Sequence, residues 1–210
     1  MSKSEDLVDK KVASDVLIIG SEGAGSRAAL AAAEQGCDVT IVSKGKIAKS
    51  GVTIMAGADI TLDGTSLHKL GFAGDPEDSE EKFFRDIVVQ GFYINNQRLV
   101  RAYVSSAPAR VRELLDWGLR VSSAGRREIN TTGVEIMRVL TSRVRNFGNI
   151  QIIEDVMVTD LLTKNGKVLG AVGVDINTGE FVLFKSKAVI LATGGWHEAY
   201  LFNTGSEGLS

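Results

Sequence analysis

The chain has 210 residues, 44% of them hydrophobic, and a formal net charge of -2, which argues against nucleic acid as a partner because nucleic-acid binders carry a concentrated basic surface. Its single cysteine, Cys37, excludes an internal disulfide, and no apolar stretch approaches the roughly 20 residues of a membrane-spanning helix. With a start that lacks the apolar core of a secretory signal, the chain is expected to be cytoplasmic, with no direct membrane insertion and membrane contact only through partner subunits.

Residues Asp15–Lys44 spell a strand, a glycine turn, an alanine-rich helix and a second strand. The apolar run Val16–Ile19 is typical of a parallel strand buried on both faces. Gly20, Gly23 and Gly25 allow a sharp turn into the helix, whose N–H groups and positive dipole end favour a pyrophosphate. The pattern therefore predicts a phosphate-binding βαβ unit.

Glu22 departs from the Gly-x-Gly-x-x-Gly fingerprint, in which the middle glycine lets the backbone approach the pyrophosphate. A carboxylate there would repel the ligand, so we expect its side chain to be turned out, with only the backbone near the ligand. The turn alone leaves open the choice between FAD and a nicotinamide cofactor, and Lys44 favours the 2′-phosphate of NADP. Residues 1–14, before this unit, are expected to be a flexible tail.

Residues 50–62 mix small, hydroxylated and apolar side chains, which favours a loop laid against a flat ligand. From residue 75 to 146 apolar residues recur at helical spacing, which predicts a helical segment. Its first three helices are expected at about Ser79–Gln90, Asn96–Ser106 and Pro108–Trp117. A polar loop then leads to a further amphipathic helix.

Four aromatic residues of this segment share near-helical spacing and are expected in the core: Phe83, Phe84, Phe92 and Tyr93. Residues 150–195 turn to strands, expected at Ile150–Ile153, Val156–Leu162, Val168–Val174 and Phe181–Phe184. The hairpin turns at 165–166 and 177–179 predict a three-stranded β-meander.

A final strand, Ala188–Leu191, runs into Ala192-Thr193-Gly194-Gly195, where the backbone can approach a ligand closely. Residues 196–210 then form a loop. In this order, the βαβ start, the run KSGVTIMAGADI, the meander and this last strand resemble the FAD-binding domain of succinate dehydrogenase and fumarate reductase flavoproteins. L-aspartate oxidase and adenylylsulfate reductase are relatives of that family, and the run KSGVTIMAGADI is most similar to archaeal-type, thiol-dependent fumarate reductases.

The resemblance implies an α/β, Rossmann-like fold of the glutathione-reductase type, with a parallel sheet, a helical insertion and a β-meander over residues 15–210. Residues 15–62 would form the βαβ unit and the flavin loop. The implied FAD contacts are Gly20, Ser21, Glu22, Gly23, Ala24 and Gly25 at the pyrophosphate, Ser43 and Lys44 at the ribose, Ser50, Gly51, Val52, Thr53, Ala56 and Gly57 along the isoalloxazine ring, Val158 at adenine, and Ala192, Thr193 and Gly194 over the adenosine and diphosphate.

Two departures from the family matter. Gly51 stands where membrane-bound members carry the histidine that links FAD covalently, so FAD is expected to be non-covalent. Ser43 and Lys44 replace the acidic residue that often binds a ribose hydroxyl. A serine there can still form a hydrogen bond.

The family moves hydride between the flavin and a C4 dicarboxylate, which implies succinate–fumarate interconversion with an iron–sulfur or thiol-reducing electron-transfer subunit. The chain ends at Ser210, before the cap domain that holds the family's catalytic residues, so no catalytic residue is assigned and the fragment is expected to be inactive. His68 and His197 lack partners at metal-ligand spacing, so no metal is expected. An aspartate oxidase or a non-catalytic NADP- or ADP-binding module are the alternatives.

Overall fold

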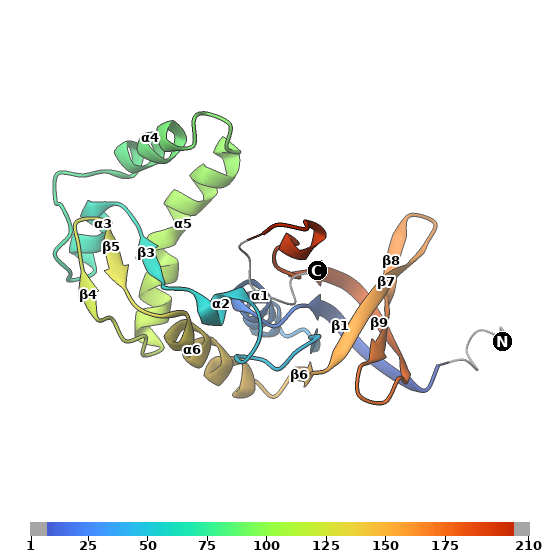
Figure 1. The fold of residues 1–210 in the computed structure, drawn as a ribbon. Coiled ribbons are helices and arrows are strands. Elements are labelled where there is room, and N and C mark those ends of the chain that lie inside the picture. The colour runs from blue at the N-terminus through green and yellow to red at the C-terminus, as the bar shows by residue number, and fades with distance from the viewer. Residues whose placement is uncertain (1–7, 204–210) are drawn as a thin grey trace. The chain divides into compact units, whose positions relative to one another are not determined.

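The computed structural model describes residues 8–203 (Figure 1). Contacts between Cα atoms divide the chain into two compact units. The first comprises the described parts of Met1–Met55 and Leu140–Ser210, and the second is Ala56–Val139. The second unit is therefore an insertion between the two chain segments that build the first.

A six-stranded sheet in the order β6-β2-β1-β9-β8-β7 frames the first unit. Its strands are β1 (Lys10–Ile19), β2 (Val39–Val42), β6 (Ile150–Ile153), β7 (Val156–Lys164), β8 (Lys167–Asp175) and β9 (Phe181–Leu191). Strands β6, β2, β1 and β9 are parallel, whereas β7, β8 and β9 form an antiparallel meander. This topology confirms the Rossmann-like α/β fold with a β-meander.

Local signals account for much of this sheet. Leu17 and Ile18 are both fully buried, and because successive strand residues point to opposite faces, β1 is covered on both sides. Asn165 and Gly166 have positive φ angles of 53° and 72°, as a two-residue hairpin turn requires. Helix α1 (Gly23–Glu34) follows β1 and buries a stripe of small and apolar residues that includes Ala29 and Leu30.

Strands β1 and β9 extend furthest beyond the bounds that the sequence predicts. The expected strands at 181–184 and 188–191 are one strand, β9, because its pairing with β1 keeps a single register from Lys10–Val182 to Ile19–Leu191. The same ladder draws Lys10–Ser14 into β1, so the expectation of a flexible tail up to residue 14 is wrong for these five residues. Residues 1–7 of that tail lie outside the described part of the chain.

The second unit combines helices with a small antiparallel sheet in the order β3-β5-β4. Its elements are β3 (Asp59–Thr61), α3 (Gly64–Lys69), α4 (Glu80–Gln90), α5 (Gln97–Asp116), β4 (Ser123–Ala124), β5 (Glu128–Asn130) and the first half of α6 (Gly133–Arg145). Two short helices, α2 (Val52–Met55) and the 3-10 helix η2 (His197–Ala199), belong to the first unit. The sequence does not predict the small sheet, because its strands are only two or three residues long.

Helix α5 joins two helices that the sequence separates at Pro108. Pro108 lies inside the helix, although proline removes one backbone donor there. Val104, Ala107 and Val111 form one buried face on both sides of it. Packing of this continuous face outweighs the local preference for a break.

The aromatic residues after α4 do not follow the expected pattern. Phe83 is buried, and Phe84 stacks its ring under the Arg101 guanidinium at 3.7 Å. Phe92 and Tyr93, however, are 83% and 67% exposed, so their assignment to the core is wrong. The helix ends at Gln90, and both residues adopt positive φ in the turn that follows, which ends the helical spacing.

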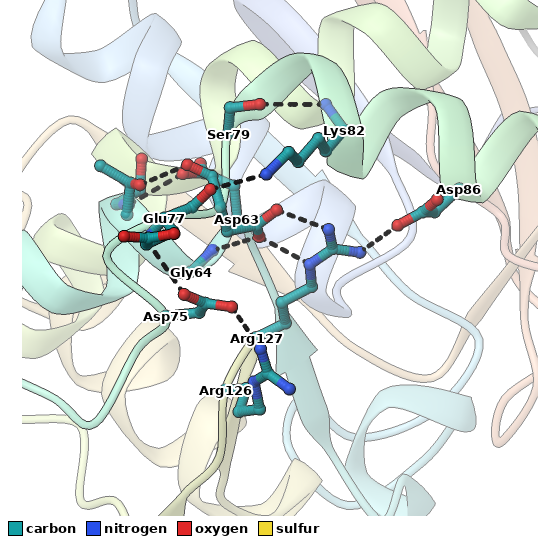
Figure 2. A network of polar contacts seen from close by, with 12 residues as sticks. Asp63, Gly64, Asp75, Glu77, Ser79, Lys82, Asp86, Arg126 and Arg127 are labelled. Atoms are coloured by element: carbon teal, nitrogen blue, oxygen red, sulfur yellow. Dashed lines mark hydrogen bonds and ion pairs between the residues drawn. The ribbon is translucent and has the colours of Figure 1, made fainter.

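A network of polar contacts that includes Gly64, Asp86 and Arg127 connects the loops of the second unit (Figure 2). The Asp78 carboxylate accepts hydrogen bonds from the Gly64 amide at 2.7 Å and from Arg127 Nε at 2.6 Å and Nη2 at 2.5 Å. Arg127 also pairs with Asp86 at 2.6 Å. Burial raises the pKa of Asp78, but the Arg127 and backbone hydrogen bonds outweigh it and lower the pKa to about 2.

Candidate functional site

A pocket of about 250 Å³ opens in the first unit, beside the carboxyl ends of β1, β2 and β9. Its walls come from the turn after β1, the segment after β2, the start of β7 and the segment after β9. The lining residues are Ile19, Gly20, Ser21, Glu22, Val42, Ser43, Lys44, Gly45, Ser50, Gly51, Val156, Met157, Val158, Ala192 and Thr193. Open α/β sheets bind ligands outside the carboxyl ends of their strands, so this is the candidate site.

The glycine turn brings three backbone segments together. The Gly20 amide donates to Val42 O at 2.8 Å, and the Ala192 amide donates to Ile19 O at 2.8 Å. Gly20 has a φ of +112°, and a Cβ atom on it would overlap the Ala192 carbonyl. A Cβ atom on Gly25 would likewise overlap the Gly20 carbonyl. These two glycines are therefore required by the close approach of the backbone, which places the positive end of α1 next to the pocket.

Two serines connect the turn to the end of β2. Ser21 Oγ donates to Ser43 Oγ at 2.9 Å, and Ser26 Oγ donates to Ser21 O at 2.8 Å. The Ser43 backbone bonds to Ile153 and Val156, which fixes its position at the pocket wall. Because Ser43 Oγ accepts from Ser21, its own proton is available to a ligand hydroxyl.

The segment after β2 is also held from the β6–β7 turn. Lys46 Nζ lies 2.5 Å from Asp155 Oδ2 and 3.4 Å from Glu154 Oε2. The Ile47 amide donates to Glu154 Oε1 at 2.8 Å. The hydrogen bond to Asp155 raises the pKa of Lys46. These contacts orient the chain that leads from Ser43 to Ser50.

The Glu22 side chain is not turned out, which corrects the expectation from the sequence. Its carboxylate accepts hydrogen bonds from the Val52 amide at 2.9 Å, the Thr53 amide at 2.7 Å and the Thr53 hydroxyl at 2.8 Å. Repulsion from a ligand phosphate is the reason to expect an outward side chain, but backbone donors about 30 residues further along the chain provide a closer partner. Only the tertiary structure brings those donors to Glu22.

Most of the predicted contact residues meet in this pocket. Those that line it are Gly20, Ser21, Glu22, Ser43, Lys44, Ser50, Gly51, Val158, Ala192 and Thr193. Gly23, Ala24 and Gly25 form the start of α1, Val52 and Thr53 start α2, and Gly194 follows the lining segment with a φ of +77°.

Ala56 and Gly57 are not among the lining residues; they belong to the second unit, where Ala56 O accepts from the Gly133 amide. The sequence reasoning missed five lining residues: Ile19, Val42, Gly45, Val156 and Met157. Ile19 and Val42 are the last residues of their strands. Their positions at strand ends were the signal that could have found them.

Strand β7 offers a further feature for recognition. It is the last strand of the sheet, so its outer edge carries backbone donors and acceptors that no neighbouring strand of the described sheet uses. Val158 lies on this strand and at the pocket wall, opposite Gly173 of β8. A flat base with donors and acceptors on its edge matches such a strand.

The fold and this pocket define a dinucleotide-binding domain of the Rossmann-like class. Residues 15–209 match the family model described as an FAD binding domain. The chain belongs to this family, and its cofactor is FAD. The residues present fit that cofactor, because the pocket joins the positive end of α1, glycine backbone, the Ser43 hydroxyl and the outer edge of β7.

Sequence and structure comparisons agree. The chain is 40% identical over 204 residues to a fumarate reductase (CoM/CoB) subunit of Methanothermobacter marburgensis, covering 89% of this chain and 36% of that protein. It is similar to a chain of the Mycobacterium smegmatis Sdh1 complex, with a TM-score of 0.83, 29% identity, and coverage of 94% and 37%. An E. coli quinol fumarate reductase gives a TM-score of 0.82, 28% identity, and coverage of 95% and 35%.

The chain thus spans about a third of the length of the relatives it matches. Those relatives include subunits of larger complexes. Within residues 8–203, no helix has the length and apolar character needed to cross a membrane. In the same residues, His, Cys, Asp and Glu side chains do not gather in groups of three or more that could hold a metal ion.

Proposed function

We propose that this chain is the FAD-holding portion of a longer flavoprotein oxidoreductase that interconverts succinate and fumarate. The observation that carries the proposal is the convergence of the Gly20 turn, Ser43, Val158 and the Ala192–Thr193 segment on one pocket. These parts lie far apart in the sequence and offer different kinds of contact to a ligand. Together they suit a dinucleotide rather than a single phosphate group.

In this proposal each wall of the pocket binds a different part of FAD. The turn at Gly20 and the start of α1 hold the diphosphate through backbone N–H groups. Ser43 binds a ribose hydroxyl, and the outer edge of β7 at Val158 binds adenine. Ala192 and Thr193 close over the adenosine and diphosphate side.

FAD is held without a covalent bond. Gly51 lines the pocket and has no side chain that could form one. In the neighbouring segment, the Val52 and Thr53 amides and the Thr53 hydroxyl donate to Glu22, and neither residue carries the histidine that would form such a bond. The cofactor would then be released when the protein unfolds.

When bound, FAD supplies hydride chemistry, and the protein's part in this chain is to bind and orient it. The dicarboxylate substrate and a partner subunit that carries electrons through iron–sulfur or thiol groups are part of the proposal for the whole protein. The printed names of the relatives, fumarate reductase among them, support this reaction. We assign no catalytic side chain to this chain and place the protein in the cytoplasm.

The first test is whether the 210-residue chain binds FAD. The purified chain should be yellow or should quench flavin fluorescence on titration with FAD, and denaturation should release free FAD into the filtrate. Fumarate reduction by the same preparation with a reduced dye should stay at the level of free flavin. Tight binding of NADP or ADP without any flavin would instead support a nucleotide-binding module, and robust fumarate turnover would contradict the assignment of catalysis to other parts of the protein.

A further inference from the structure

The carboxylate of Glu22 has a complete set of partners in one short segment. Oε1 accepts from the Val52 amide, and Oε2 accepts from the Thr53 amide and hydroxyl, at distances from 2.7 to 2.9 Å. Hydrogen bonds to an ionised group are shorter and stronger than those between neutral groups. Glu22, the residue before α1, is thereby bonded to the first two residues of α2.

Thr53 connects the same two segments from the other side. Its hydroxyl donates to Glu22 Oε2 and also accepts from the Gly23 amide at 3.3 Å. The Thr53 side chain lies 3.4 Å from the position that a Cβ atom on Gly23 would take. Glu22, Gly23 and Thr53 therefore form a closed ring of contacts at the start of α1.

Gly51 completes this arrangement. Its φ is +86°, and a Cβ atom built on it would overlap the Glu22 carboxylate. The carboxylate thus fills the space into which a side chain of residue 51 would project. Glu22 and Gly51 are sterically dependent on each other, and both line the pocket.

We propose that Glu22 is a positioning residue of the FAD pocket, whose carboxylate holds residues 51–53 against the start of α1 before the cofactor binds. This inference rests on the proposed function for its ligand. In a pocket without this contact, FAD itself would have to order the segment, and that ordering would weaken its binding. In this protein the Glu22 carboxylate orders the segment before FAD binds.

The negative charge of Glu22 acts in the opposite direction, because it faces a site for a diphosphate. Two amide dipoles and a hydroxyl dipole point at the carboxylate and offset part of its field. In this proposal the anchoring effect has to exceed the remaining repulsion. Loss of the carboxylate should weaken FAD binding rather than strengthen it.

Amide hydrogen exchange of the FAD-free chain tests the anchoring directly. In E22G, the amides of Val52 and Thr53 should exchange about 10-fold faster or more, because both acceptor oxygens are lost. E22Q keeps one acceptor oxygen, so at least one of the two amides should exchange faster, by a smaller factor. Glu34→Gln is the matched control, since Glu34 is an exposed glutamate at the far end of the same helix. Unchanged exchange at Val52 and Thr53 in both Glu22 variants would overturn the proposal.

Binding measurements test the consequence for the cofactor. E22Q and E22G should raise the FAD dissociation constant about 10-fold, which corresponds to about 1.4 kcal/mol, mainly through faster release. Gly51→Ala should weaken binding as well, but in the E22G background it should add less, because the overlap with the carboxylate is gone and only the strain of the positive φ remains. Tighter FAD binding by E22G, or full additivity of the two changes, would contradict the inference. Failure of the wild-type chain to bind FAD would count against the proposed function, while the exchange experiment would still decide the role of Glu22.

Discussion

The Gly20→Ala variant is expected to bind FAD with a dissociation constant about 100-fold higher or more, equivalent to about 2.7 kcal/mol. The added methyl group would overlap the Ala192 carbonyl, so the segment after β9 must move away from the turn after β1. Both segments line the pocket, and its walls would separate at the position of the diphosphate. The φ of +112° adds backbone strain to this overlap.

The same substitution should lower the free energy of unfolding by about 2–4 kcal/mol. Gly36→Ala is the matched control, because Gly36 also has a positive φ, of +80°, but nothing lies within 4 Å of an added Cβ atom. That variant should lose only about 1 kcal/mol and bind FAD normally. Flavin fluorescence titration and urea unfolding measure the two effects. Equal, small losses in both variants would show that the contact between the turn and Ala192 does not shape the pocket.

Asp78→Ala should lower the free energy of unfolding of the second unit by about 3 kcal/mol. The substitution removes the acceptor of three hydrogen bonds and leaves the Arg127 guanidinium without its buried partner. Asp86→Ala removes the other carboxylate from the same guanidinium, but the Asp86 side chain is 52% exposed. That control should cost less than about 1 kcal/mol. Urea unfolding followed by tryptophan fluorescence compares the two variants, and similar losses would contradict the central position of Asp78.

The Asp78 contact also predicts a dependence on pH. The pKa of Asp78 is lowered from 3.8 to about 2 in the folded protein, so the carboxylate stabilises the fold fully above pH 3.8. This contribution, about 2 kcal/mol, is lost as the pH falls from about 4 towards 2. The wild-type chain should therefore lose more stability than Asp78→Asn over this interval. Parallel pH profiles of the two proteins would refute the assignment of the shift to Asp78.

Elements with strong local signals could be predicted from the sequence. The apolar run Val16–Ile19, followed by the glycine turn, predicts a buried strand and a helix start, and both are present. The Asn165-Gly166 pair predicts the β7–β8 hairpin, because its backbone angles suit those residues locally. The resemblance to the flavoprotein family predicts that Ser43, Val158 and Ala192 belong to one site. In the structure these three residues line one pocket.

Other features depended on contacts that local patterns do not encode. Residues Lys10–Ser14 join β1 because β9 provides a pairing partner for each of them. Pro108 remains inside α5 because one buried face runs along the whole helix. Phe92 and Tyr93 have aromatic side chains, but they lie exposed in the turn after Gln90.

The sequence by itself determined the βαβ start with its phosphate-binding turn and the β-meander, because each depends on residues that are neighbours in the chain. Only the tertiary structure decided the direction of Glu22. Its partners, Val52 and Thr53, lie 30 and 31 residues away, and their amides become available only when the chain after β2 folds back to the start of α1. A carboxylate that looks misplaced beside a diphosphate site in the sequence is thus anchored by long-range hydrogen bonds in the fold.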